Sequence, residues 1–400
     1  MLKKIGVDQL VEGMYIHELC ASWVEVPFWS TRFLVDSSLL LSKVQRSGVR
    51  ELYIDTSKGN DVLEVRALPA EAKSATPTLE TAVSTPESRS NAEEFGQAAK
   101  ILAQSREAVS LMFSEARMGR VTEIEKAGAL VDQIAASVIR NQHALVALSR
   151  LKNADDYTYM HSVAVCAMMI ALARQLQLSD DEVRVCGKAG LLHDIGKMAV
   201  PIEILNKPGR LTDSEFEQVR RHPQAGYELM LRVPGLPAIA MDVCLHHHEK
   251  FDGTGYPNGL RGTGISLYAR MGAICDVYDA ITSNRPYKAG WCPAESLRRM
   301  AEWTKQGQFD PTLFAAFVKC VGIYPVGTLL KLKSGRLAVV MDVSKSLLRP
   351  VVKVLYSSKS MAYLPPELID LSVQPQEEVV SREEASNWGL TDLEKFWMQG

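Results

Sequence analysis

Hydrophobic positions recur at helical spacing through the middle of this 400-residue chain, whereas strand-like alternation is found toward both ends. Residues 1–66 mix short strand-like runs at 14–17 and 52–54 with a helix-like stretch over 37–48, which predicts a small α+β domain. Residues 67–92 are rich in Pro, Ser, Thr, Ala and Glu. Such a composition buries too little apolar surface to offset the entropy of ordering, so we expect a flexible linker.

A helical segment is expected over 93–150. Its first helix should run from about 91 to 118, and its second should open with a capping box at Thr122. Apolar side chains then recur every three or four residues as far as Leu148, which predicts one long helix. The apolar stripe would pack either on the chain's own next domain or in a dimer seam, with Asn141 as a polar residue that sets the register.

Residues 151–322 follow a helical pattern almost throughout, and capping boxes at Ser179 and Thr212 mark two helix starts. The first of these helices should lead into His193, and the second should carry His222 nearly three turns in.

Strand-like periods return over 323–375 and predict a small β appendage. The tail at 376–400 could close as a short amphipathic helix. We therefore expect a mainly α protein, in which an all-helical central domain lies between a small N-terminal α+β domain and the β appendage.

Composition and charge narrow the function classes. The formal net charge of −2 gives no general reason to bind a nucleic-acid polymer, so an anionic substrate must be attracted by a local site. The seven cysteines are odd in number and lack CxxC spacing, which is typical of reduced, buried thiols. The N-terminus lacks a signal-type apolar core, and the longest apolar run, at 163–173, is too short to span a bilayer. These features predict a cytoplasmic protein without membrane insertion.

Histidines concentrate in the central domain, where six of the eight lie between positions 161 and 248. A single histidine on a helix is more often a packed or surface residue, so the hypothesis of a metal site depends on their accumulation beside carboxylates. The candidate ligands are His161, His193, Asp194, His222, His247, His248 and Asp276. Seven nitrogen and oxygen donors without cysteine favour a dinuclear iron or manganese centre over a structural zinc site. We interpret His246 as a packing or outer-shell residue, and His17 and His143 as ordinary.

The motifs that contain these residues resemble the HD-GYP family, a subgroup of the HD superfamily of metal-dependent phosphohydrolases. In chain order they are DYT at 156–158, HS at 161–162, HDIGK at 193–197, KPG at 207–209, HP at 222–223, HHE at 247–249, DGTGYP at 252–257, DVYDA at 276–280 and RPY at 285–287. Residues 1–66 resemble, less specifically, a small domain of poorly defined function that often precedes HD-GYP domains.

The resemblance implies hydrolysis of cyclic di-GMP, a bacterial second messenger, to linear pGpG and in many members onward to GMP. It implies that the seven candidates bind two divalent ions, Fe or Mn before Mg or Ni, with Asp194 as the bridge. Two metals about 3.5–4 Å apart lower the pKa of a bridging water to about 7, and the hydroxide attacks phosphorus. Lys197 could neutralise the scissile phosphate. Control of biofilm and motility would follow from this substrate.

Substrate contacts are expected from a glycine-rich loop and from a segment downstream of it. Glycines let a backbone approach a ligand, proline stiffens the loop, and tyrosine offers an aromatic face, while downstream cations could meet the second phosphate. The residues concerned are Gly255, Tyr256, Pro257, Asp279, Arg285 and Lys288.

One position departs from the pattern of part of the family, where a glutamate four residues before the first ligand histidine helps hold a third metal. Here this position is Tyr157, so we expect two metals and pGpG as the main product. Other hypotheses remain: a catalytically weak cyclic di-GMP receptor or interaction protein, a hydrolase of another cyclic dinucleotide such as cGAMP, and, more remotely, a di-iron oxygenase. A homodimer or a signalling partner is compatible with the sequence.

Overall fold

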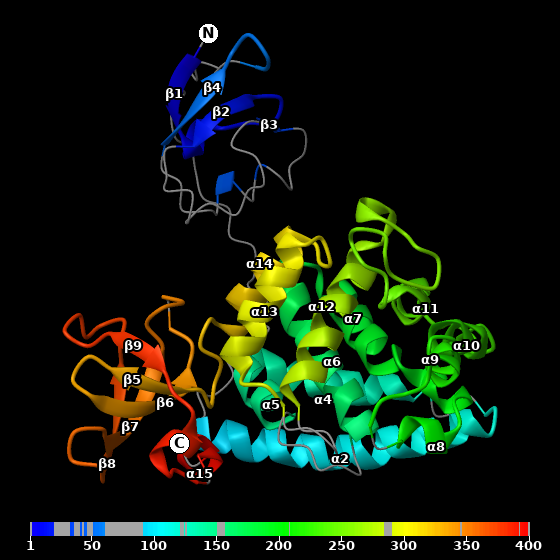
Figure 1. The fold of residues 1–400 in the computed structure, drawn as a ribbon. Helices are drawn as coiled ribbons and strands as arrows, with labels where there is room; N and C mark the ends of the chain where they lie inside the picture. Colours follow the sequence, from blue (N-terminus) through cyan, green and yellow to red (C-terminus); the bar gives the residue numbers. More distant parts are fainter. Residues whose placement is uncertain are drawn as a thin grey trace, which may run out of the picture. The chain divides into compact units, whose positions relative to one another are not determined.

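The computed structural model describes residues 2–19, 33–35, 41, 44–45, 51–60, 91–120, 124, 126–149, 157–207, 209–283, 290–344, 346–391 and 393–398. The chain divides into two compact units, Met1–Val83 and Ser84–Gly400 (Figure 1). Of the expected linker at 67–92, only the last two residues are described, and they begin a helix. Most of the helix-like stretch at 37–48 lies outside the described residues.

The N-terminal unit contains an antiparallel four-stranded sheet in the order β1-β4-β2-β3. Its strands are β1 (Leu2–Gly6), β2 (Tyr15–Leu19), β3 (Phe33–Leu34) and β4 (Glu51–Asp55), and the short 3-10 helix η1 spans Val7–Gln9. The hydrophobic core of this unit includes four fully buried side chains, those of Met14, Ile16, Leu52 and Ile54. Both predicted strand runs therefore contribute to the core.

The second unit begins with a helical domain. Its helices are α2 (Asn91–Arg117), α4 (Ala127–Arg140), α5 (Gln142–Ser149), α6 (Tyr157–Gln175), α7 (Asp180–Leu192), α8 (Ile202–Leu205), α9 (Asp213–Val219), α10 (His222–Met230), α11 (Ala238–His246), α12 (Leu267–Thr282), α13 (Pro293–Lys305) and α14 (Pro311–Val321). The described residues of this unit also form the 3-10 helices η3 (Ile195–Ala199), η4 (Gly262–Gly264) and η5 (Ala385–Trp388).

Helix α6 is the centre of the helical domain. Every residue from Val163 to Ala173 exposes at most 2% of its surface, because helices α2, α4, α5, α7, α12 and α14 pack around it. The longest apolar run of the sequence is therefore a core helix that is hydrophobic on all sides. In the described part of the chain, no helix has both the length and the apolarity to cross a membrane.

The prediction of one long helix after residue 122 is wrong, because two helices, α4 and α5, form there and are separated at Asn141. The backbone of Asn141 is extended (φ −148°, ψ 101°), and its Oδ1 accepts the N–H groups of His143 and Ala144 at 3.0 Å each. Asparagine thus caps the start of α5, a role that its short polar side chain favours. The stripe, represented by Ile134 and Leu145, is buried in the chain's own core, so Asn141 is a helix cap and not a register residue.

The helix that starts at Thr212 is also shorter than expected. The capping box forms, with the backbone N–H of Glu215 donating to Thr212 Oγ1 at 3.3 Å, but α9 ends at Val219. His222 is instead the first residue of α10, with Pro223 in the first turn. Proline is tolerated in the first turn of a helix and disrupts a helix interior, which explains why the chain restarts here.

The C-terminal β region is an antiparallel five-stranded sheet in the order β8-β7-β6-β5-β9. Strands β5 (Leu329–Leu332), β6 (Arg336–Asp342) and β7 (Val351–Ser357) were predicted, whereas β8 (Ala362–Asp370) and β9 (Val379–Arg382) were missed. Because β9 pairs with β5, the sheet extends beyond the expected boundary at 375. The final helix α15 (Glu394–Met398) forms as expected, and Trp397 packs edge-on against Phe95 of α2 with ring centroids 5.4 Å apart.

Figure 1 shows α2 running along one side of the helical domain, from the C-terminal sheet to the region of α8 and α10. All six cysteines that the structure describes are free thiols, and five of them are buried. Cys20 lies outside the described residues.

Candidate metal centre

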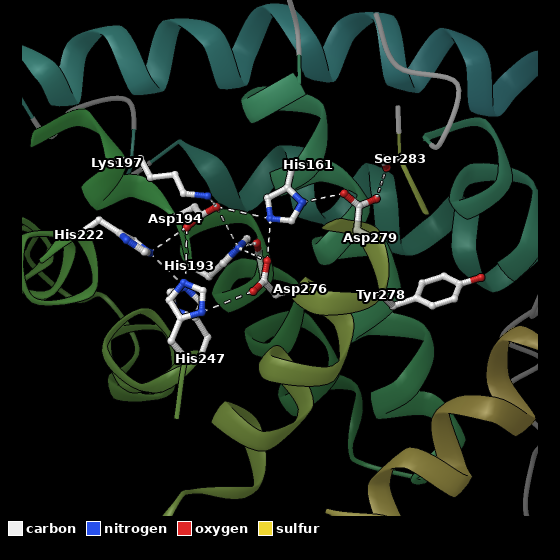
Figure 2. Close-up of polar contacts among 12 residues, drawn as sticks. His161, His193, Asp194, Lys197, His222, His247, Asp276, Tyr278, Asp279 and Ser283 are labelled. Carbon is white, nitrogen blue, oxygen red and sulfur yellow. Dashed lines mark hydrogen bonds and ion pairs between the residues drawn. The ribbon is translucent and has the colours of Figure 1, made fainter. Parts of the chain in front are cut away.

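Side chains from five separate segments meet in one buried cluster inside the helical domain (Figure 2). His161 comes from α6, His193 and Asp194 from the end of α7, His222 from the start of α10, His247 and His248 from the end of α11, and Asp276 from α12. Their donor atoms form two groups, each within 4.8 Å: Asp194, His222, His247 and His248 in one, and His161, His193 and Asp276 in the other. All seven predicted ligand residues are thus brought together.

The turn after α7 places the central carboxylate. Helix α7 is capped by His193, and Asp194 has a non-helical backbone (φ −102°, ψ 9°) that leads into η3. Asp194 therefore lies in the turn after the helix. A Cβ at Gly196 would lie 1.9 Å from the carbonyl oxygen of His222, so only glycine lets η3 approach α10 closely. The HDIGK motif thus brings Asp194 beside His222.

The imidazole rings are oriented by acceptors outside the cluster. The Nδ1 atoms of His193, His222 and His247 each lie 2.7–3.0 Å from the carbonyl oxygen three residues earlier, and Nδ1 of His161 lies 2.6 Å from Asp279. A carbonyl oxygen can only accept, so the Nδ1 atoms of His193, His222 and His247 carry the hydrogen and their Nε2 lone pairs face inward. This is the tautomer that a metal ligand needs.

Asp194 lies between the two groups of donors. Its Oδ1 is 3.2 Å from Nε2 of His222 and 3.7 Å from Nε2 of His247, whereas its Oδ2 is 3.4 Å from Nε2 of His161 and 3.3 Å from Nε2 of His193. Within the described residues, Asp194 Oδ1 and His193 Nε2 are buried without a well-formed hydrogen bond. Such atoms are costly to bury unless something binds them, so the donor set fits divalent ions.

Both cluster carboxyl groups are anionic. Burial alone would raise the pKa of Asp194, but Lys197, which forms an ion pair with it, and His193 hold that pKa well below its usual range. Burial is likewise outweighed at Asp276, where the hydrogen bond with His161 keeps the pKa of the carboxyl group low. The cluster therefore has a strong local attraction for cations in a chain with little net charge.

The histidines differ in their protonation. Burial lowers the pKa of His247 far below its usual value and that of His248 to about 3, so both are neutral donors. At His161 burial acts in the same direction, but hydrogen bonds to Asp194, Asp276 and Asp279 outweigh it and raise the pKa to about 10. A metal ion bound at His161 would therefore displace a proton.

The glycine-rich loop lies against the cluster through one aromatic contact. The ring of Tyr256 lies 4.8 Å from that of His248, tilted by 31°. A Cβ at Gly255 would meet the backbone nitrogen of Lys250 at 2.3 Å, so this glycine allows the loop to pack on its own backbone. Pro257 is exposed on the same loop.

Glu249 is a structural residue of this loop that our sequence reasoning missed. Its side chain is buried, and its carboxylate accepts the backbone N–H groups of Asn258 at 2.7 Å and Leu260 at 3.1 Å. The HHE motif therefore combines two candidate ligands with the residue that closes the 249–260 loop.

Asp279, which was expected to contact the substrate, lies inside the helical domain. Only 1% of Asp279 is exposed, and its carboxylate lies behind His161, where Ser283 Oγ donates to it at 3.1 Å. The spacing from Asp276 was the available signal, since residues three apart share one helix face. Arg285 and Lys288, and the side chain of Tyr157, lie outside the described residues.

His246 belongs to neither of the two donor groups. Its Nδ1 lies 2.8 Å from Oδ1 of Asp242, and Asp242 in turn accepts a hydrogen bond from Ser266, the N-cap of α12. This chain of contacts links α11 to the helix that carries Asp276.

Comparison with known proteins gives matches over both units. The HD domain family model matches residues 135–313, and a model for a domain of unknown function (DUF3391) matches residues 2–127. The cyclic di-GMP phosphodiesterase PA4108 of Pseudomonas aeruginosa is 53% identical over 400 residues, which covers 99% of this chain and 96% of that protein.

Two further relatives match over shorter stretches. The cyclic di-GMP phosphodiesterase response regulator RpfG of Xanthomonas campestris is 39% identical over 180 residues, or 43% of this chain and 47% of that protein. The 3'3'-cGAMP-specific phosphodiesterase 3 of Vibrio cholerae is 37% identical over 171 residues, or 43% of this chain and 37% of that protein.

Proposed function

The chain belongs to the HD-GYP family and is a metal-dependent cyclic di-GMP phosphodiesterase, and we propose that the buried cluster of seven side chains is its dinuclear centre. The observation that supports two sites is the position of Asp194, whose two carboxylate oxygens face different groups of imidazoles. When bound, two divalent ions would supply Lewis acidity and lower the pKa of a water molecule between them.

The chain's own residues explain how a phosphodiester would be held. His248 and Lys197 are the more exposed parts of the site, with side-chain exposures of 24% and 22%, against 1% for Asp194. The substrate therefore approaches from the side of these two residues. The ammonium group of Lys197, which is paired with Asp194, can neutralise charge on the phosphoryl oxygens, and Tyr256 forms an aromatic wall beside His248.

Asp279 acts on the substrate only through His161. Its buried carboxylate accepts the Nδ1 hydrogen of His161, fixes the ring and increases the basicity of Nε2. We assign it as a positioning residue.

We further propose which metal ions are bound, which product is formed and in which compartment the reaction takes place. We propose Fe or Mn as the resident ions, and pGpG as the main product because Tyr157 stands where a third-metal glutamate is found in other members. We place the reaction in the bacterial cytoplasm, where the described free cysteines would stay reduced, and expect it to affect biofilm formation and motility.

The test is product separation after incubating metal-assayed protein with cyclic di-GMP. The protein loaded with Fe or Mn should form pGpG first, and Asp194→Asn should lower the rate by about a hundredfold or more. Asp370→Asn, a carboxylate on β8 far in sequence from the cluster, is the control and should retain full activity. No turnover by the metal-loaded wild type would refute the proposal, and GMP as the dominant early product would refute the assignment of pGpG.

A further inference from the structure

Arg220 lies next to the proposed metal centre but outside it. It occupies the turn between α9 and α10, two residues before His222. Its guanidinium carbon lies 4.7 Å from the centroid of the Tyr256 ring, and this ring in turn lies 4.8 Å from the ring of His248. Arg220, Tyr256 and His248 therefore form a series of contacting planar groups that extends from a proposed ligand to a side chain that is 37% exposed.

The ring of Tyr256 is held firmly. Its backbone N–H donates to the carbonyl oxygen of His248 at 3.3 Å, and the carboxylate of Glu249 closes the loop behind it through two backbone hydrogen bonds. Because the loop is fixed at both sides of Tyr256, the ring can serve as a preorganised stacking surface.

Arg220 retains hydrogen-bonding capacity at its edges. In the described part of the chain, the one hydrogen bond of its guanidinium runs from Nη1 to Glu217 at 2.9 Å, and Glu217 is 61% exposed, so this ion pair is weak. A guanidinium has five N–H donors in its plane. With the tyrosine ring against one face, these donors remain available to a ligand that lies in the same plane.

A purine base matches this arrangement better than a phosphate does. The cation paired with a cluster carboxylate is Lys197, on Asp194, whereas Arg220 contacts an aromatic ring. Arginine forms a bidentate pair with O6 and N7 of guanine, and bases stack on tyrosine and arginine planes. Adenine presents a donor instead of O6, which would oppose the guanidinium.

We propose that Arg220 determines base specificity by reading the O6 and N7 edge of one guanine of the substrate while the base lies against Tyr256. This inference depends on the proposed cyclic di-GMP hydrolysis.

The experiment measures kcat and KM for cyclic di-GMP, and the inhibition constant of cyclic di-AMP as a competitor, on the full metal-loaded chain. Arg220→Gln should raise KM for cyclic di-GMP about tenfold while the inhibition constant of cyclic di-AMP stays constant or falls, because glutamine pairs with adenine. Arg220→Lys, which keeps the charge without the fork, should give an intermediate ratio of the two constants.

Arg221→Gln is the matched control, since Arg221 is the next residue, carries the same charge and is exposed. It should leave both constants unchanged. Equal increases in both constants after Arg220→Gln would show a general charge effect and overturn the proposal, as would no change in either. If the Gln variant does not fold, the same comparison is made with Arg220→Lys. Failure of the wild type to hydrolyse cyclic di-GMP would instead refute the proposed function.

Discussion

Removal of the Asp279 carboxylate, which contacts His161, should weaken metal binding even though Asp279 is not itself a proposed metal ligand. Asp279 Oδ2 lies 2.6 Å from His161 Nδ1, and both side chains are 2% exposed. Asp279→Ala would leave a buried N–H without an acceptor, which costs about 1–3 kcal/mol, or about a 10- to 100-fold loss of metal affinity. Asp279→Asn retains an acceptor but loses the charge, and charge-assisted hydrogen bonds are roughly twice as strong as neutral ones. Asp279→Asn should therefore lose less metal affinity than Asp279→Ala.

The assay is competition for Mn²⁺ between each protein and a chromophoric chelator, combined with kcat for cyclic di-GMP and thermal unfolding of the metal-free protein. Asp310→Asn provides the control for stability. Asp310 is another largely buried aspartate, and it caps α14 through the N–H groups of Thr312 and Leu313 at 2.8 and 3.2 Å. This control should lower the unfolding temperature without changing metal affinity. The reasoning is refuted if Asp279→Ala binds Mn²⁺ within about twofold of wild type, or if the control loses as much affinity.

Three further predictions concern the proton, the lysine and the loop. Because the pKa of His161 is raised to about 10, bound metal must displace its proton, so Mn²⁺ affinity should increase from about pH 6 to 9; affinity independent of pH would contradict this. Lys197→Met should lower kcat by about a hundredfold and change KM less, and steady-state kinetics within about threefold of wild type would count against a charge-neutralising role. Glu249→Gln keeps one side-chain oxygen, whereas the backbone N–H groups of Asn258 and Leu260 each donate to a different oxygen of Glu249. The unfolding temperature should therefore fall and KM should rise. Unchanged values would show that these two hydrogen bonds do not hold the loop.

The clustering of the seven candidate ligands could be predicted from the sequence because residue type and motif order carry the signal. All seven candidates enter the two donor groups, although the helices expected around His193 and His222 are broken in the structure. The break at Asn141 was missed for a related reason, since an apolar period of three to four residues continues through a cap when two short helices bury the same face.

The partners of the ligands could not be predicted, because tertiary geometry determines them. Asp279 was expected to face the substrate, yet the packing of α12 against α6 places its carboxylate behind His161. The loop-closing role of Glu249 depends on backbone N–H groups that carry no sequence signal. Nothing in the local sequence distinguishes Arg220 from its neighbour Arg221, and only the fold places it against Tyr256.

Titration of metal-stripped protein with Mn²⁺ or Fe²⁺, with cyclic di-GMP hydrolysis measured at each addition, counts the ions that the cluster needs for turnover. For a dinuclear centre we expect no turnover without metal, a rise to a plateau at two equivalents per chain, and loss of activity in Asp194→Asn at every addition. Full hydrolysis by metal-stripped protein, or a plateau at one equivalent, would contradict it.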